Sequence, residues 1–220
     1  MFTVRIWDLP TRLFHWALAL CVIGLLITGN IGGDAMLWHF RLGYAVLSLV
    51  LFRLVWGLVG GHWSRWAQLS LQPALVWAYL KGRPPSASVA GHNPMGSWAI
   101  VAMLSFLIFQ VATGLVSDDE IAYSGPLTAM VPGQWVSWAT SWHTHWGKLT
   151  ILFLVALHVL ALVWYRFAKR ISLVPAMVHG NKQLAALAVS SHDHWSTRLI
   201  ALLILVMASC GVYALLGWGS

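Results

Sequence analysis

The residues best suited to chemistry in this chain are histidines that lie within long apolar segments. His15, His39, His143 and His158 each stand in or at the edge of such a segment, and His145 closely follows His143. Ionisable side chains at membrane depth usually face the interior of a helix bundle and mark function. Because neutral imidazole is a common metal ligand, these residues could hold a metal group. An inter-helix hydrogen bond is the alternative for any one of them alone.

Two imidazoles on facing helices suit the two axial positions of a haem iron. Such a six-coordinate iron has no open site for a substrate and favours electron transfer. Zinc usually takes four ligands, which commonly include Cys or a carboxylate, whereas the apolar segments contain no Asp or Glu. The sequence has no C-x-x-C-H motif for covalent attachment of a c-type haem. Haem b is therefore the expected cofactor.

These histidines must be positioned by helices that cross a membrane. The 220-residue chain is 59% hydrophobic and 9% charged, whereas soluble domains carry about 25% charged residues. The period-two alternation of a membrane barrel is absent, so helices must satisfy the backbone in lipid. The sequence predicts an all-α integral membrane helical bundle, a single domain over residues 1–220. Its spans are expected at about 13–31, 36–59, 98–116, 143–167 and 198–217.

The distribution of basic residues predicts how these spans are oriented. Lys and Arg residues gather before the first span, between the second and third, and between the fourth and fifth. The connections on the opposite side hold Asp34, Asp118, Asp119 and Glu120, without Lys or Arg. The positive-inside rule then places the N-terminus in the cytoplasm and the C-terminus outside. The net charge of +7 is explained by this topology, so the lipid bilayer, and not nucleic acid, is the expected partner.

This orientation sorts the histidines into two pairs by depth. His39 and His143 lie toward the outside, whereas His15 lies toward the cytoplasm. His158 follows His143 by about 22 Å of helix, at 1.5 Å per residue, and so joins the inner pair. At about 100° per residue, His143 faces within roughly 60° of His158, whereas His145 misses by roughly 140°. His143 is therefore the better outer ligand and His145 the alternative.

Small residues accompany three of these histidines. Ala19, Gly43 and Gly147 each follow a candidate ligand by four residues, which places them on the same helix face. These small residues could let the flat porphyrin ring of a haem approach the helix. Taken alone, such residues are better explained by ordinary packing between membrane helices.

Several motifs resemble the bacterial cytochrome b561 family, which is also grouped with the b-type cytochrome subunit of nickel–iron hydrogenases. The resemblance covers about residues 3–170 and is carried by "VRIWDLPTRLFHWALAL", "WHFRLGYAVLSLVLFRLVWG", "GHNPMG", "TGLVSDDEIAYSGPL" and "WHTHWGKLTILFLVALH". It implies a four-helix core with two b-type haems in a bacterial inner membrane. The fifth span lies outside that core.

The family pattern has one ligand histidine in the first helix, one in the second and two in the fourth. Carried over to this sequence, these ligands are His15, His39, His143 and His158. Many members have a single histidine at the start of the fourth helix, slightly closer to the second ligand. The "HTH" sequence at residues 143–145 therefore leaves the choice between His143 and His145 open.

Cations near the histidines are candidate partners for haem propionates. Arg41 and Lys148 are the basic residues beside the outer pair, and they are expected to bind the propionates of an outer haem. Arg12 and Arg53 could serve an inner haem in the same way. Snorkelling of these long side chains to the membrane interface is the alternative.

The leading functional hypothesis is transmembrane electron transfer through two bis-histidine b-type haems. Electrons would pass between a quinone pool, with ubiquinone as the candidate, and a redox partner such as a c-type cytochrome or an oxidoreductase subunit. The acidic run at residues 118–120 could dock a lysine-rich cytochrome, although a solvated loop is the simpler interpretation. No catalytic residue is predicted.

Two other functions compete with this hypothesis. Some family relatives resemble oxidases of superoxide that reduce quinone, but the acidic outer loop disfavours attraction of an anion. A transporter that relays protons or metal ions through histidines is the second alternative. Transporters of that kind usually carry carboxylates within the membrane, and the predicted spans contain none.

Overall fold

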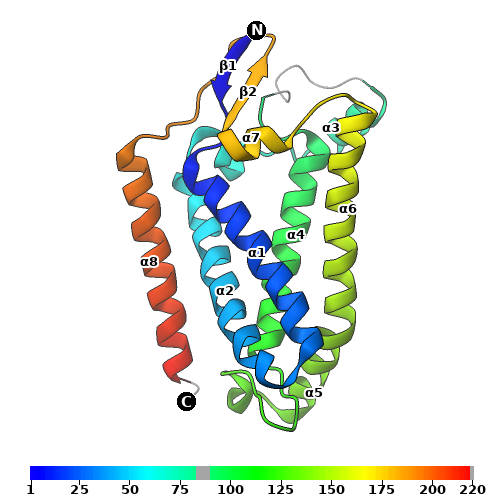
Figure 1. Ribbon diagram of the computed structural model, residues 1–220, viewed down its shortest axis with the longest axis vertical. Coiled ribbons are helices and arrows are strands. Elements are labelled where there is room, and N and C mark those ends of the chain that lie inside the picture. Colours follow the sequence, from blue (N-terminus) through cyan, green and yellow to red (C-terminus); the bar gives the residue numbers. More distant parts are fainter. Residues whose placement is uncertain (83–89, 219–220) are drawn as a thin grey trace. The chain divides into compact units, whose positions relative to one another are not determined.

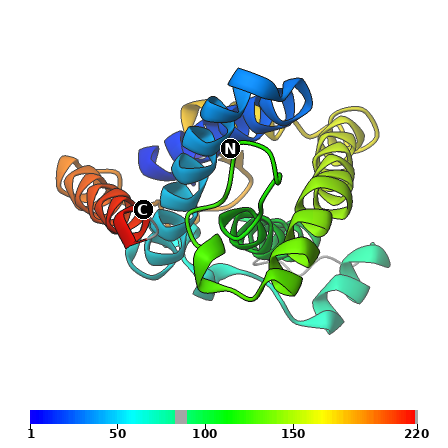
Figure 2. The same ribbon diagram turned by 90° about the horizontal axis from the view of Figure 1, so that it is seen from below.

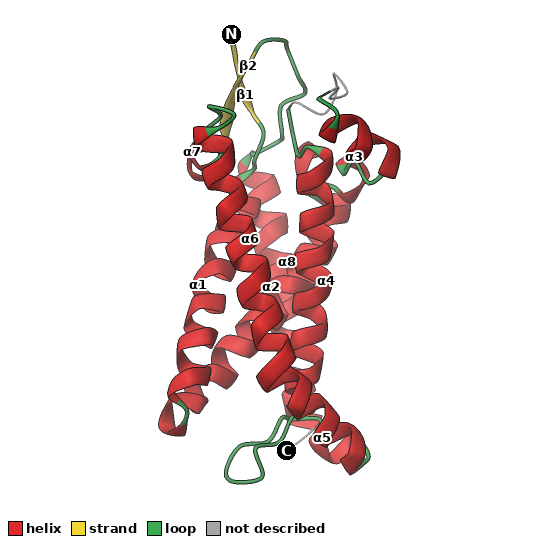
Figure 3. Ribbon diagram, turned by 90° about the vertical axis from the view of Figure 1, so that its right-hand side faces the viewer, coloured by secondary structure: helices red, strands yellow, loops and turns green. Residues whose placement is uncertain are grey.

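The computed structural model describes residues 1–82 and 90–218, and its regular structure is predominantly helical (Figure 3). Five helical segments are long and apolar enough to cross a membrane. The all-α integral membrane bundle predicted from the sequence is thereby confirmed. Along the chain the elements are β1 (Phe2–Arg5), α1 (Leu9–Ile31), α2 (Met36–Val59), α3 (Pro73–Leu80), α4 (Pro94–Leu115), α5 (Gly133–Ser141), α6 (Lys148–Phe167), α7 (Val174–His179), β2 (Asn181–Leu184) and α8 (Trp195–Trp218).

The fourth membrane-spanning segment is continuous from Gly133 to Phe167. It consists of α5, a π-helical turn at Trp142–Gly147, and α6. The apolar pattern predicts a regular α-helix here, so the π-helical turn is a difference from expectation. Such turns are rare and often stand at functional sites. This one contains both His143 and His145.

Large apolar side chains cover the exposed surface of the long helices. On α6, for example, Phe153, Leu160 and Trp164 are each more than 60% exposed. A soluble protein rarely exposes apolar side chains in such continuous patches. In lipid the same surface costs nothing, and the helical backbone satisfies its own hydrogen bonds.

The chain divides into two compact units. Unit 1 comprises residues 1–15, 53–103 and 157–204, and unit 2 comprises residues 16–52, 104–156 and 205–220. Each membrane-spanning segment contributes one part to each unit.

In unit 1, β1 and β2 form an antiparallel pair that α7 leads into (Figure 1). Phe2 stands opposite Leu184, and Arg5 stands opposite Asn181. The pair packs on a buried apolar cluster that contains Val4, Ile6, Trp7, Ala90, Ala176 and Leu184. This cluster joins the N-terminus of the chain to the segment that precedes α8.

Asp8 anchors the start of α1 within unit 1. Its carboxylate is fully buried and accepts hydrogen bonds from the Thr11 backbone N–H (2.8 Å), the Ser64 hydroxyl (2.6 Å), the Gly61 N–H (3.2 Å) and Trp56 Nε1 (3.3 Å). The bond to Thr11 is an N-cap, which satisfies a free amide of the first helical turn. Asp8 thereby ties α1 to the end of α2.

The N-terminal end of α8 is held by Asp193, also in unit 1. This carboxylate pairs with Arg5 and with Arg198 Nε, the latter at 3.0 Å, and it lies 3.9 Å from Arg12 Nη2. Burial by itself would raise the pKa of Asp193. Hydrogen bonds from Arg198, the Leu9 backbone and Arg5 outweigh it and hold the pKa below its ordinary value.

In unit 2, a tight turn joins α1 to α2. Gly32 and Gly33 have φ angles of 68° and 53°, a region in which glycine alone avoids strain. The loop between α4 and α5 lies at the same end of this unit (Figure 2). Asp119 Oδ1 accepts the backbone N–H groups of Ile121, Ala122 and Tyr123. These bonds lower the pKa of Asp119, so this acidic side chain fixes the loop.

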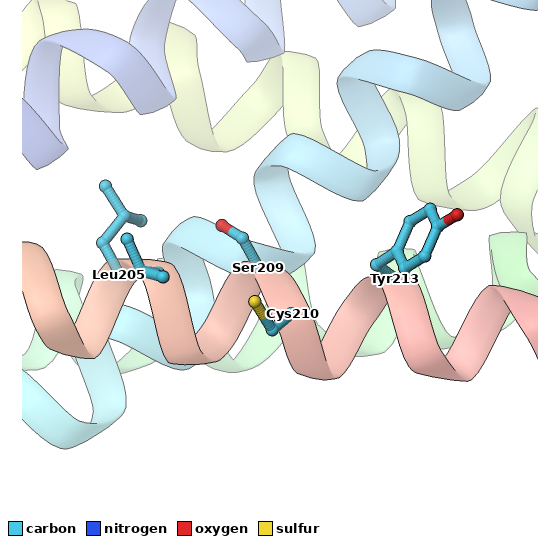
Figure 4. Close-up of a pocket in the computed structure, with 5 residues that line it drawn as sticks. Leu205, Ser209, Cys210 and Tyr213 are labelled. Carbon is cyan, nitrogen blue, oxygen red and sulfur yellow. The ribbon is translucent and has the colours of Figure 1, made fainter.

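The part of α8 in unit 2 carries an open, mostly apolar groove on its own surface (Figure 4). Leu205, Val206, Ser209, Cys210 and Tyr213 line it. Cys210 and Cys21 are both free thiols.

Candidate functional site

The first histidine pair lies in unit 1. His15 comes from α1 and His158 from α6, and their ring centroids are 6.3 Å apart with an interplanar angle of 50°. The inner pair expected from depth along the helices is thus a close pair in space.

The second pair lies in unit 2. His39 comes from α2 and His143 from the π-helical turn, with ring centroids 6.1 Å apart and an interplanar angle of 85°. These are the two residues that depth assigns to the outer pair. Four histidines distant in sequence are therefore brought together two by two.

The tautomer of the second pair is set by backbone carbonyls. His39 Nδ1 lies 3.1 Å from the Leu25 carbonyl oxygen of α1, and His143 Nδ1 lies 2.9 Å from the Gln110 carbonyl oxygen of α4. A carbonyl can only accept, so each Nδ1 carries the proton. Each Nε2 is left with a lone pair for a metal.

Gln110 holds His143 from two directions. Its carbonyl accepts the His143 ring N–H, and its side-chain Nε2 donates to the His143 carbonyl oxygen at 2.9 Å. A π-helical turn displaces carbonyls from their usual i+4 partners, so this amide supplies a donor where the helix is irregular. Gly147 makes room for it, because a Cβ there would lie 1.8 Å from Gln110 Oε1. Gly147 therefore serves helix packing.

His145 points into different surroundings. It is exposed, and its Nδ1 lies near the Thr144 hydroxyl (2.9 Å) and the Ser141 carbonyl (3.3 Å), both within its own turn. The pair with His39 is formed by His143.

The cations expected near the second pair both lie in unit 2. Arg41 is exposed and stands over the Trp38 ring, 5.1 Å from its centroid. Lys148 Nζ lies 3.4 Å from Asn30 Oδ1. Neither forms an ion pair among the described residues.

The cations expected near the first pair are engaged with protein groups of unit 1. Arg53 is buried, donates to the Ser64 carbonyl at 3.0 Å and lies over the Trp66 ring. Arg12 donates to the Val178 carbonyl at 2.5 Å. Both side chains thus help to join helix ends.

The geometry of both pairs fits a single metal held between two imidazoles. A metal–imidazole bond is about 2.0–2.1 Å, which puts the centres of two rings on opposite sides of one metal about 6.3 Å apart. The observed separations are 6.3 and 6.1 Å. Within the described residues there is no cluster of three or more His, Cys, Asp or Glu that could hold a metal. Two-ligand coordination is the pattern of a bis-histidine haem and not of zinc.

The helix surface one turn from His39 is open. At Gly43 on α2, no described atom beyond the backbone of the same helix and the two chain neighbours lies within 4 Å of the position that a Cβ would occupy. Of the small residues noted in the sequence, Gly43 is therefore open to an approaching group, whereas Gly147 contacts Gln110.

Residues 6–180 match the family model of the prokaryotic cytochrome b561. The chain belongs to this family. Membership and the five apolar helices identify it as a multi-pass membrane cytochrome that carries haem b and serves electron transport.

The curated relatives that match this chain are described as cytochrome subunits. A probable Ni/Fe-hydrogenase B-type cytochrome subunit of Bradyrhizobium diazoefficiens is 25% identical over 217 residues, which cover 82% of this chain and 86% of the relative. A protein of the same description from Cupriavidus necator is 27% identical over 213 residues, covering 80% and 85%. The probable Ni/Fe-hydrogenase 1 B-type cytochrome subunit of Escherichia coli K12 is 26% identical over 144 residues, covering 52% and 60%.

The "GHNPMG" motif of the cytochrome b561 family acts in the structure as a helix start. Asn93 Oδ1 accepts the Gly96 N–H at 2.7 Å, and Asn93 Nδ2 donates to the Tyr165 hydroxyl at 2.7 Å. His92 packs on Trp7, with ring centroids 4.4 Å apart. Burial, and then the charges of Lys182 and Arg53, lower the pKa of His92 to about 3. The motif thereby fixes the start of α4.

Two contributors to the second pair were not predicted from the sequence. Gln110 is a polar residue whose partner, His143, is remote in sequence. The other is a Thr–Gly dipeptide that occurs both at Thr28-Gly29 and at Thr113-Gly114. Its repetition at the ends of two helices is a signal that the sequence does contain.

Proposed function

We propose that the chain transfers single electrons across the bacterial inner membrane through two b-type haems. His15 and His158 would hold one haem, and His39 and His143 the other. The observation that carries the proposal is the pair of centroid separations, 6.3 and 6.1 Å, which suit one metal between two rings. When bound, each haem supplies a one-electron iron couple with no open coordination position.

The protein residues orient the ligands and keep them neutral. The Leu25 and Gln110 carbonyls fix the Nδ1–H tautomer of His39 and His143. A hydrogen bond of this kind makes the opposite nitrogen a better donor to a metal. The same hydrogen bonds fix the orientation of the two rings, so the protein itself supplies the ordering that coordination requires.

Arg41 and Lys148 are proposed to neutralise the propionates of the haem in unit 2. Both are free of carboxylate partners among the described residues. Lys148 contacts only the neutral Asn30 amide among the hydrogen bonds of its side chain described in the structure, so its charge is available to an anion.

The electrons would pass between a quinone, with ubiquinone as the candidate, and an oxidoreductase subunit or a c-type cytochrome. The relatives are described as hydrogenase cytochrome subunits, which favours an oxidoreductase partner. The basic connections support a cytoplasmic N-terminus and a periplasmic C-terminus.

The proposal is tested by removing one ligand of each pair. We expect His39→Ala to lose the haem of unit 2 and retain that of unit 1, and His15→Ala to give the reverse. Haem per chain and reduced-minus-oxidised spectra measure both losses. His179→Ala, an exposed histidine at the end of α7, is the control and should retain both haems. Full haem content in the two ligand variants would refute the assignment.

A further inference from the structure

We propose that two matching Thr–Gly seats position the axial histidines of unit 2. Thr113-Gly114 on α4 receives His143, and Thr28-Gly29 on α1 receives His39. The inference rests on the proposed function, since it concerns how these histidines present Nε2 to a haem iron.

The seat on α4 encloses the His143 ring on two sides. The ring Nδ1 lies 2.9 Å from the Gln110 carbonyl and 3.4 Å from the Thr113 hydroxyl. The ring also lies directly on Gly114, where a Cβ would come within 2.7 Å of Cε1 and 3.1 Å of Nδ1. A side chain larger than hydrogen at residue 114 would have to push the imidazole away.

The seat on α1 repeats this arrangement for His39. The ring Nδ1 lies 3.1 Å from the Leu25 carbonyl and 3.3 Å from the Thr28 hydroxyl. A Cβ at Gly29 would lie 3.1 Å from Cε1 and 3.2 Å from Nδ1. The contact is therefore of the same kind and somewhat looser.

The spacing explains why the same dipeptide serves both helices. In each seat the acceptor carbonyl belongs to residue i, the threonine is i+3 and the glycine is i+4. Residues i+3 and i+4 lie over the carbonyl of residue i on one helix face. Glycine leaves that carbonyl open to a second donor, and the threonine hydroxyl supplies another oxygen beside it. A ring from a neighbouring helix can then donate its Nδ1–H to a carbonyl already bonded within its own helix.

Glycine substitutions test the positioning role. We expect Gly114→Ala to weaken retention of the unit 2 haem by about 10- to 100-fold, the range for lost outer-shell support of a metal ligand. Gly29→Ala should act in the same direction with a smaller effect, because its contact is looser. The readouts are haem per chain and the low-spin ferric signals of the oxidised protein in electron paramagnetic resonance.

Two other helix glycines provide matched controls. Gly24→Ala on α1 meets only the flexible end of Leu42, and Gly96→Ala on α4 lies 3.4 Å or more from its neighbours. Both control variants should retain both haem signals unchanged. The signal assigned to His15 and His158 reports correct folding in every variant.

Removal of the Thr113 hydroxyl should change the midpoint potential of the unit 2 haem, a quantity that a purely packing role would leave unaltered. Thr113→Val keeps the shape of the side chain and removes the oxygen near Nδ1. A ligand imidazole with fewer acceptors for its N–H donates less electron density to the iron, so the unit 2 midpoint potential should become more positive, with haem content unchanged. The unit 1 potential should not move.

The outcomes separate the inference from the function on which it rests. Fewer than two haems in the unaltered protein would refute the proposed function itself. Two haems in the unaltered protein, with an unchanged signal in Gly114→Ala, would refute the positioning role of the Thr–Gly seats and leave the proposed function intact. Equal loss of both haems in Gly114→Ala would also overturn them, since Gly114 would then act in folding generally. A selective change at unit 2, ordered Gly114 before Gly29, would establish them.

Discussion

At the scale of single residues, the choice between His143 and His145 depends on where each ring points. His143 faces His39 at 6.1 Å between centroids, whereas His145 is exposed and bonds within its own turn. We therefore expect His143→Ala to abolish the spectrum of the unit 2 haem and His145→Ala to preserve it. Reduced-minus-oxidised difference spectra of the two variants measure this. Loss of the unit 2 haem in His145→Ala, with the haem retained in His143→Ala, would show that His145 is the ligand.

Gln110 is the polar residue on which the π-helical turn depends. Its amide donates to the His143 carbonyl, and the residue is only 8% exposed. Gln110→Leu removes the donor but keeps much of the volume, leaving a carbonyl without its partner at a cost of about 1–3 kcal/mol.

We expect this loss to lower the midpoint temperature of thermal unfolding, measured by circular dichroism in detergent. Gln134→Leu is the matched control, because Gln134 is exposed on α5, and it should leave the midpoint unaltered. Equal midpoints for both variants would show that the amide contributes nothing to the turn.

At the scale of elements, the attachment of α8 depends on charge. The folded pKa of Asp193 lies below its ordinary value because the arginines stabilise the carboxylate more than burial opposes it. Its stabilising contribution is therefore complete above the unfolded pKa of about 3.9 and is lost as pH falls through the lower folded pKa. We expect Asp193→Asn to destabilise the protein at neutral pH and to reduce the loss of stability on acidification.

Unfolding midpoints between neutral and acidic pH measure this dependence. Asp34→Asn, at an exposed aspartate in the turn between α1 and α2, serves as the control and should follow the unaltered protein. An Asp193→Asn variant with the acid profile of the unaltered protein would contradict the anchoring role.

The membrane helices could be predicted from the sequence because apolar length is a local property. Hydropathy alone indicates five spans, and the depth of His15, His39, His143 and His158 along them indicates which rings can meet. The π-helical turn at residues 142–147 could not be predicted in this way. It depends on the Gln110 amide, a donor from another helix, and periodicity within one segment contains no information on that contact.

The buried polar contacts were hidden for the same reason. Asp8 precedes the first span and resembles any helix cap, yet its oxygens also bond Trp56, Gly61 and Ser64. Whether the histidine pairs bind iron stays a prediction of geometry and family pattern.

At the scale of the whole molecule, composition and family membership agree. A chain with 59% hydrophobic residues and five apolar helices belongs to a family of membrane cytochromes. The two histidine pairs lie in different compact units. We therefore expect each unit to lose its proposed haem independently, which is the reason for the selective losses expected of the single variants.

The most direct test of the account is the haem content of the purified, unaltered protein. Extracted haem, quantified against protein concentration, should give two haem b per chain, and the oxidised protein should show two low-spin bis-histidine signals. One haem per chain, or none after expression with an ample haem supply, would contradict the central claim.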